Sequence, residues 1–322
     1  MGHVSGDLFA FFGRVRNVVL LEAVQFDGAG PYRGATRYEA SIDNAYALNR
    51  TVTLLGKLGY QRIRYAGLQG YRFSGITWNA GVRLTPNAED FVELRYGERD
   101  GVYDFAADVS YAPTARTRLL ARYDTGVTST TENQQNLLSG TRVDSFGGSV
   151  DSLTGGPVST TSGFFGTQNS VFELNRLSIT GIYALSRDTV SVSLVREERS
   201  PAGNAARRGN AGQNGLGQNG LEQGAGFRGD SGIYGTINWQ HDVAADLRTN
   251  VSVQVGTRSA SRLDGQGGSA SERTISATAG TSYQLSETLG SQATYVFNQR
   301  TGGGGNRSFT ENLLLVGLRK TF

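Results

Sequence analysis

Ser231 is the residue of this chain whose surroundings most resemble those of a catalytic nucleophile. It lies in Gly-Asp-Ser-Gly at residues 229–232, and a serine nucleophile needs a histidine base within hydrogen-bond reach and an acid that orients it. The sequence offers two histidines, His3 at the start and His241 at the far end of the strand that Ser231 would begin. We therefore expect a loop-to-strand junction, no catalytic residues, and a protein that is not an enzyme.

A second set of residues that could do chemistry consists of acidic and basic residues that alternate with apolar ones. They are Asp104, Asp108, Asp124, Arg116, Arg118 and Arg122. Such a set could bind a metal or hold an acid–base pair. It could also be a ladder of opposite charges across the wall of a water-filled barrel. The many arginines favour the ladder and argue against a calcium cage of free carboxylates. We expect no metal and no cofactor.

Further basic residues occupy the same phase of other predicted strands: Arg37, Lys57, Arg83, Arg95, Arg248, Arg258 and Arg319. Together with the ladder they predict the lining of a lumen in which positive groups outnumber negative ones. The summed field of such a lumen favours anionic or polyhydroxylated solutes over cations.

Composition excludes several other classes of protein. The chain has 322 residues and no cysteine, which rules out disulfides, thiol nucleophiles and Cys-ligated zinc. Hydrophobic residues make up only 38%, and no run approaches the roughly 18 apolar residues of a membrane helix. A net charge of +3 is too small to suggest nucleic acid as a partner. The composition does not exclude transmembrane β-strands, because only alternate residues of such a strand face lipid.

Apolar and polar residues alternate through most of the chain, which is the pattern of strands with one apolar face. The pattern is clearest at 247–258, 116–127, 102–111 and 76–84. Weaker examples bring the prediction to about fourteen strands, within a range of roughly 12–16: 15–27, 36–48, 51–64, 91–98, 174–185, 188–198, 231–241, 273–285, 290–300 and 308–322. Residues 1–14 are expected to be an N-terminal segment, as in the remnant of a longer chain, and residues 15–322 a single barrel.

The connections between these strands alternate in length, which predicts a topology. Short turns such as 48–51 and 186–188 alternate with longer, mostly Gly-rich connections. This rhythm is typical of an antiparallel up-and-down transmembrane β-barrel with short periplasmic turns and long extracellular loops. It places both termini in the periplasm. Loops 128–172 and 200–229 are the longest, and 128–172 could lie outside or fold into the lumen as a constriction.

The C-terminal strand carries the signal expected of such a barrel. From residue 309 to Phe322 apolar residues alternate with polar or small ones, with Leu318 on the same face as Phe322 and Gly317 on the other. A terminal aromatic residue on an amphipathic strand is the feature that the barrel assembly machinery recognises. Gly317, Leu318 and Phe322 are therefore predicted to form an assembly signal.

Three segments resemble a known family. They are residues 74–87 (Ser-Gly-Ile-Thr-Trp-Asn-Ala-Gly-Val-Arg-Leu-Thr-Pro-Asn), 94–105 with Tyr-Gly-Glu-Arg, and 121–128. The chain is similar here to outer-membrane β-barrels associated with PEP-CTERM/exosortase and exopolysaccharide loci, within a broader group of β-barrel porins. Residues 172–178, 195–200 and the last strand extend the resemblance. It implies a location in the outer membrane of a Gram-negative bacterium and a link to polysaccharide or surface-protein systems, and it supplies no catalytic residues.

Two functions follow as hypotheses. The first is a porin-like channel with a net basic lumen, tied to export of exopolysaccharide or surface protein. The second is a non-conducting structural or adhesion barrel whose long loops bind surface polymers or partner proteins. Expected partners are outer-membrane lipid and lipopolysaccharide, the barrel assembly machinery, and polysaccharide or small anionic solutes, with no nucleic acid.

Overall fold

The computed structural model describes residues 2–12, 14–26, 34–65, 71–129, 132–133, 140–143, 149–152, 171–202, 229–261, 269–302 and 308–320. These residues are almost entirely β-strand, in one antiparallel sheet of 15 strands and a separate two-stranded sheet. Among them, no helix is long and apolar enough to cross a membrane, a finding that bears on helices alone. The described residues thus have an all-β fold, as predicted.

The large sheet contains β1 (Gly2–Phe12), β2 (Val15–Phe26), β3 (Ala35–Ala47), β4 (Val52–Arg64), β5 (Arg72–Leu84), β6 (Phe91–Arg99), β7 (Val102–Thr114), β8 (Thr117–Ser129), β11 (Val171–Ala184), β12 (Asp188–Pro201), β13 (Asp230–Asp242), β14 (Leu247–Ser261), β15 (Ser269–Ser286), β16 (Leu289–Gly302) and β17 (Phe309–Lys320). The small sheet pairs β9 (Thr141–Val143) with β10 (Ser149–Asp151). Both short strands lie within the predicted loop 128–172.

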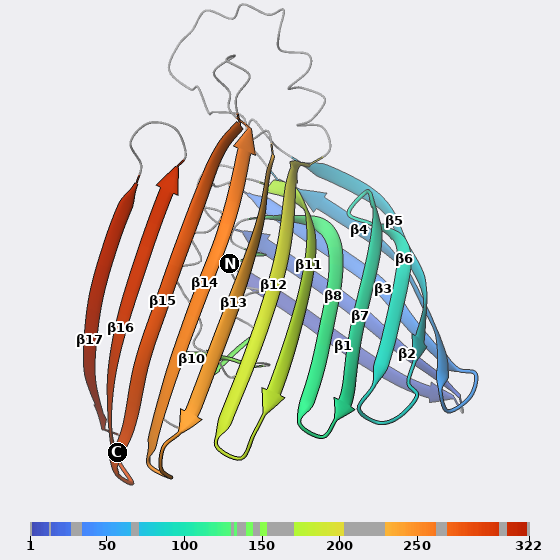
Figure 1. Cartoon of the computed structure of the whole chain (residues 1–322). Coiled ribbons are helices and arrows are strands. Elements are labelled where there is room, and N and C mark those ends of the chain that lie inside the picture. The colour runs from blue at the N-terminus through green and yellow to red at the C-terminus, as the bar shows by residue number, and fades with distance from the viewer. Residues whose placement is uncertain are drawn as a thin grey trace, which may run out of the picture.

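The order of strands in the large sheet is their order in the chain, with β8 adjacent to β11. Every neighbouring pair is antiparallel, so the topology is up-and-down, as the alternating connection lengths predict. Figure 1 shows that the sheet curls strongly, so that β1–β5 lie behind the strands that face the viewer. The fold is that of a transmembrane β-barrel of the outer-membrane type.

One strand of the large sheet was not predicted. Residues 2–12, assigned from sequence to an N-terminal segment, form β1 and pair with β2 from Gly2↔Gln25 to Phe12↔Val15. The additional strand reverses the chain direction once more. Gly2 therefore lies at the end of the sheet where the long connections are, and Lys320 lies at the opposite end with the short turns. The two ends of the described chain therefore lie at opposite ends of the sheet, whereas both termini were predicted to lie in the periplasm.

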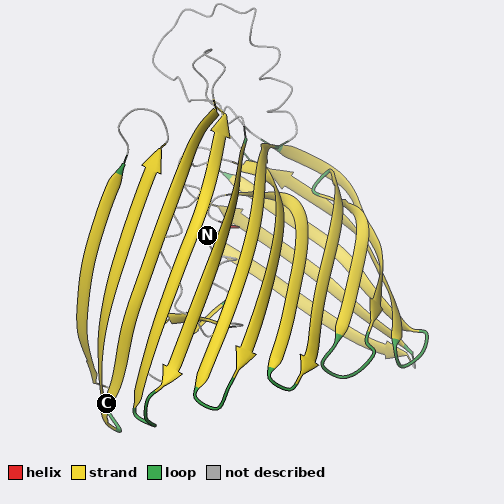
Figure 2. Ribbon diagram, in the orientation of Figure 1, coloured by secondary structure: helices red, strands yellow, loops and turns green. Residues whose placement is uncertain are grey.

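The short turns gather at one edge of the sheet, which Figure 2 shows in green at the bottom of the picture. Asparagine builds two of them. The Asn49 side-chain oxygen accepts hydrogen bonds from the backbone N–H groups of Thr51 and Val52, both at 2.8 Å. Asn87 does the same for Asp90 at 2.8 Å. Such side-chain-to-backbone bonds replace a backbone turn and fix where each hairpin reverses.

The outer face of the sheet is apolar across its middle. On β4 and β5, Tyr60 pairs with Ile76, Leu58 with Trp78 and Leu54 with Val82. Leu58 is 61% exposed and Ile76 63% exposed, which is a large apolar area for a residue to leave in water. Because the same phase repeats on the other strands, the exposed residues form a continuous belt suited to lipid.

Aromatic rings cluster on the outer face of β5–β7, close to the hairpin that joins β6 and β7. Trp78 meets Tyr96 edge-on, with ring centroids 6.3 Å apart, and Tyr96 stacks on Tyr103 at 6.2 Å. Amphipathic rings of this kind favour the interface between hydrocarbon and headgroups. The end of the sheet with the long connections is called the loop end below, and the other the turn end.

Candidate functional site

The tip of the β6–β7 hairpin is the centre of the candidate site. Asp100 and Gly101 connect the two strands with φ angles of 56° and 74°. Two central residues with positive φ form a type I′ turn, for which Asp-Gly is a preferred sequence. The hairpin extends less far toward the loop end than the neighbouring β5. The pairing of β6 with β5 stops at Trp78↔Glu98, whereas β5 extends a further six residues in that direction, to Arg72. The tip therefore ends below the loop end of its neighbours.

The tip also separates from β8. The β7–β8 register begins at Ala107↔Tyr123 and continues toward the turn end. Closer to the loop end, side chains contact the β8 backbone instead. Arg99 Nη2 donates to the carbonyl of Thr125 at 2.7 Å, and the N–H of Val127 donates to Asp100 Oδ2 at 3.3 Å. These bonds satisfy backbone groups that strand pairing would otherwise use.

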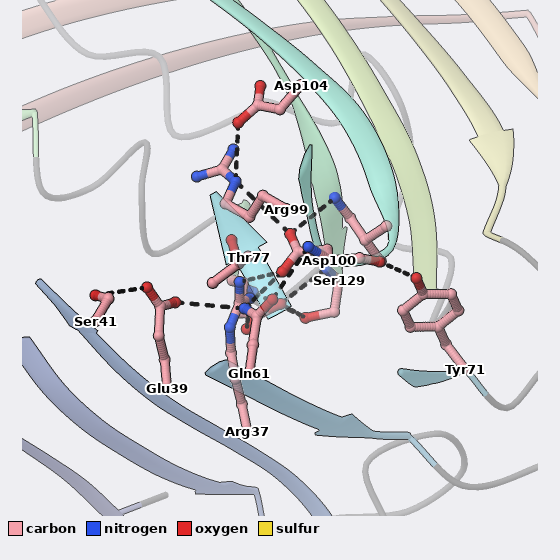
Figure 3. A network of polar contacts seen from close by, with 12 residues as sticks. Arg37, Glu39, Ser41, Gln61, Tyr71, Thr77, Arg99, Asp100, Asp104 and Ser129 are labelled. Atoms are coloured by element: carbon pink, nitrogen blue, oxygen red, sulfur yellow. Dashed lines mark hydrogen bonds and ion pairs between the residues drawn. The ribbon is translucent and has the colours of Figure 1, made fainter. Parts of the chain in front are cut away.

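Asp100 is the most connected residue of the tip, and Figure 3 shows the strands that converge on it. Its Oδ1 accepts from Arg37 Nη2 at 2.8 Å and from Gln61 Nε2 at 2.7 Å. Its backbone N–H donates to Gln61 Oε1 at 3.1 Å. The carboxylate is only 2% exposed, so the charge relies on these partners in place of water. The hairpin tip is thereby fastened to the inner faces of β3 and β4.

From this point a ladder of ion pairs descends the inner wall toward the turn end. Lys57 pairs with Glu39, and Arg95 bridges Asp43 at 3.6 Å and Glu93 at 2.7 Å. These pairs lie on β3, β4 and β6, whereas the charge ladder considered from sequence lies on β7 and β8, where Arg122 is 3.5 Å from Asp124. The ion pairs also fix the side chains of the lining.

The root of loop 128–172 joins the same network. The Tyr65 hydroxyl donates to Glu132 Oε2 at 2.9 Å, and Arg37 Nη1 lies 3.6 Å from Glu132 Oε1. Ser129 also donates to Glu132, through its backbone N–H at 3.0 Å. The loop thus begins by crossing from β8 to the inner side of β3 and β4, the course expected of an inward fold. Its middle, residues 153–170, lies outside the described part of the chain.

An apolar cluster packs beside the network at the loop end. Its buried members come from β2 through β12: Val24, Phe26, Ala35, Ile63, Tyr65, Tyr71, Val127, Val171 and Ala202. Phe26 and Tyr65 are in ring contact at 5.8 Å. A buried cluster on the inner side of a barrel narrows the space there, because its side chains occupy what would otherwise be lumen.

Two tyrosines connect the apolar cluster to the polar network. Tyr71 donates its hydroxyl hydrogen to the backbone carbonyl of Asp100. Burial, reinforced by the charge of Asp100, raises the pKa of Tyr71 to about 12. Burial together with Glu132 also raises the pKa of Tyr65 above its usual range. Both phenols therefore remain protonated donors at any physiological pH.

Tyr71 predicts a loss of stability in alkali. Below its ordinary pKa of about 10 the phenol is neutral in folded and unfolded chains, and its hydrogen bond contributes fully. As pH rises toward 12, the unfolded chain ionises first, so stability falls. We expect Tyr71→Phe to cost about 1 kcal/mol at neutral pH and to flatten this alkaline fall in urea unfolding. A fall of equal size in the variant would contradict the assignment.

A second polar cluster lies on the inner face of β12–β14, also near the loop end. Arg258 holds Asp230 Oδ2 through Nη2 at 2.6 Å and Nε at 3.1 Å. The Arg199 guanidinium lies over the Phe172 ring at 4.7 Å and 3.9 Å from Glu197. Below it the wall is mainly uncharged, as in the hydrogen-bonded pair Asn238 and Ser191. The lining is thus charged along β3–β8 and mostly hydroxyl and amide along β12–β16.

Most of the predicted lining residues lie in ion pairs. Arg37, Lys57, Arg95 and Arg258 pair as described above. Further pairs are Arg83 with Glu93, Arg99 with Asp104, Arg122 with Asp124, and Arg248 with Asp242. Asp108 is directly opposite Arg122 across the sheet, and Arg116 lies in the β7–β8 turn. Within the ranges described, Arg118 and Arg319 have no acidic partner within ion-pair distance, and no His, Cys, Asp and Glu cluster could hold a metal.

Ser231 and His241 occupy opposite ends of β13. Ser231 pairs with Glu198 at the loop end, and His241 pairs with Asp188 at the turn end. Their separation along one strand is about 33 Å. His241 Nδ1 is instead 2.8 Å from Asp188 Oδ1, and its ring stacks on Trp239 at 5.7 Å. The two residues therefore do not form a nucleophile–base pair.

The predicted assembly signal is described in part. Gly317 and Leu318 lie near the end of β17, with Leu318 directed outward and 74% exposed. Phe322 lies outside the described residues. Leu318 extends the apolar belt to the last strand of the sheet, in the phase that the sequence predicts.

The residues at the centre of the site were not identified from sequence. Asp100, Gln61, Tyr65, Tyr71 and Glu132 were not among the predicted lining residues. Asp-Gly at 100–101 was a usable signal, because it predicts a type I′ turn. The inward course of that turn depends on the unequal lengths of β5 and β6, which the sequence does not reveal.

The fold and the inner wall together define the class of this protein, an outer-membrane-type β-barrel with an ion-paired polar lining. No protein-family model matches the chain, and no curated protein matches it. Among solved structures it is similar to OmpT, an outer membrane protein of Vibrio cholerae, at 10% identity over 97% of this chain and 99% of that one, with a TM-score of 0.39.

Two other solved structures also match most of this chain at low sequence identity. A bacterial polysaccharide outer membrane secretin matches at 9% identity over 99% of this chain and 90% of its own, with a TM-score of 0.40. OccK3 of Pseudomonas aeruginosa matches at 11% identity over 95% and 78%, also with a TM-score of 0.40.

Proposed function

We propose that this protein is a passive, porin-like channel of the bacterial outer membrane. The observation that carries the proposal is the division of one sheet into an apolar outer belt and a charged, ion-paired inner wall. The belt requires lipid around the barrel. The wall requires water inside it, because ionised side chains in hydrocarbon are costly. We place the loop end outside the cell and the turn end in the periplasm.

Exposed charges on the inner wall support a wet lumen. The Arg122 side chain is 67% exposed on the inner face, and its partner Asp124 is 36% exposed. Arg83 is likewise 43% exposed beside Glu93. A loosely paired arginine retains much of its hydration, so the space that these residues face is suited to water.

The selectivity of the channel depends on the charges of its lining that have no acidic partner. Ion pairs neutralise much of the basic lining, and Arg118 and Arg319 supply the remaining positive charge. We therefore propose a modest preference for anions, with passage of uncharged polyhydroxylated solutes along the hydroxyl and amide wall of β12–β16. The resemblance to exopolysaccharide-associated barrels is what suggests saccharide as cargo and a role beside polysaccharide or surface-protein export.

Swelling of liposomes tests the channel. Vesicles that contain the folded protein should swell in iso-osmotic monosaccharide and more slowly as saccharide size increases. Swelling no faster than protein-free vesicles would contradict the proposal. The control is the same protein heated until its barrel unfolds, as judged by gel mobility.

A second candidate is a non-conducting barrel that binds surface polymer or a partner protein. The observation that favours it is the narrowing of the inner side at the loop end by the hairpin tip, the apolar cluster and the root of loop 128–172. It predicts no swelling, and binding that disappears when residues 134–170 or 203–228 are deleted from an otherwise folded barrel. In both candidates the protein is not an enzyme.

A further inference from the structure

Three arginines form an exposed basic patch on the outer face of the barrel, above the lipid belt. They are Arg62 and Arg64 on β4 and Arg72 on β5, all exposed. Their direction follows from their neighbours, because the alternate residues Gln61 and Ile63 are buried on the inner side. We name these three residues the outer arginine patch.

The patch lies just above the border of the belt. Arg62 follows Tyr60 by two residues, which is about 7 Å along the strand, and Arg64 lies about 7 Å further. The Tyr60 hydroxyl is 2.7 Å from Ser74 Oγ, one step toward the loop end. The polar end of this interfacial ring therefore points at the level where headgroups begin, and the arginines occupy that level.

The patch has no counter-charge within the described chain. Arg64 and Arg72 are direct cross-strand partners, and Arg62 is opposite Ser74. Like charges directly opposite each other destabilise a sheet. On β3 the facing residues are Thr36 and Tyr38, and the connection at residues 66–70 contains no acid. By contrast, Arg196 at the loop end of β12 is paired with Glu198.

We propose that the outer arginine patch binds the phosphate groups of lipopolysaccharide in the outer leaflet. Guanidinium groups bind phosphate bidentately, and arginine is preferred where such geometry matters. A phosphorylated glycolipid supplies both parts of the match, acyl chains against the belt at Tyr60 and Ile76 and phosphate at the arginines. This proposal rests on the outer-membrane placement within the proposed function and adds a lipid site to it.

Lipid binding by the detergent-purified full chain tests the proposal. Native mass spectrometry would measure retention of bisphosphorylated lipid A and of lipid A stripped of its phosphates. We expect the wild type to bind the phosphorylated form at least tenfold more tightly. The triple variant Arg62→Gln, Arg64→Gln, Arg72→Gln should lose this difference, and a triple lysine variant should retain part of it.

Arg196→Gln is the matched control, because it removes an outward arginine that already has an acidic partner. Equal retention of the two lipids by the wild type would overturn the proposal without any variant, as would a loss in Arg196→Gln equal to that of the triple glutamine variant. Liposome swelling by the same preparations tests the channel independently of the lipid site. Swelling without lipid selectivity rejects the lipid site alone, and lipid selectivity without swelling rejects the channel alone.

Discussion

Replacing Asp100 with asparagine is expected to lower the free energy of unfolding by about 3 kcal/mol, near the lower end for breaking a buried ion pair. Asparagine tolerates the left-handed backbone at φ 56° and leaves the turn in place. It removes the charge, so the buried Arg37 loses its closest carboxylate and retains only that of Glu132, 3.6 Å away. Loss of stability would be measured by urea unfolding of the detergent-solubilised protein, followed by circular dichroism.

The matched control is Asp124→Asn, which breaks the exposed pair with Arg122. An exposed pair contributes roughly 0–1 kcal/mol, so this variant should unfold almost as the wild type does. In the channel account, Asp100→Asn also releases the hairpin tip, and ionic current through single channels should rise or become noisier. Equal stability of the two variants would show that the tip is not fastened by Asp100.

An arginine at Ile237 is expected to impair assembly, with a cost of about 2–4 kcal/mol near the middle of the bilayer. Ile237 lies midway along β13 on the outer face and is 55% exposed. In lipid its replacement places a charge against acyl chains. The measurement is the amount of folded, heat-modifiable protein in the outer-membrane fraction.

Thr236→Arg is the control for Ile237→Arg, because the neighbouring residue points to the inner wall. Water in the lumen should accommodate the added charge, and we expect near-normal abundance. Impaired assembly of Thr236→Arg with normal assembly of Ile237→Arg would contradict this assignment. It would mean that the apolar face of the sheet is turned toward water and the polar face is buried.

The strand framework could be predicted from sequence because each strand carries its own pattern. Lipid on one side and water on the other impose a period of two on every strand, as at 247–258, which is β14 in the structure. The short turns could be predicted for a local reason, since Asn49 and Asn87 form bonds within their own turns. Strand β1 was missed because Leu8-Phe-Ala-Phe-Phe at 8–12 interrupts the alternation.

The candidate site could be predicted only in part. Arg37 and Asp104 could be assigned to the inner wall because phase is local, and in the structure they pair with Asp100 and Arg99. Their partners were not predictable, since Asp100 reaches Arg37 across 63 positions of sequence. That contact depends on how far β6 extends beside β5 and on where β7 leaves β8. Both are properties of the assembled sheet.

Single-channel recording across a planar bilayer would show whether the barrel conducts ions. The folded wild-type protein should produce discrete conductance steps, and in a potassium chloride gradient the reversal potential should show a modest preference for chloride. Protein that is fully folded by heat modifiability and circular dichroism, yet produces no steps over the bilayer background, would contradict the account of a water-filled channel.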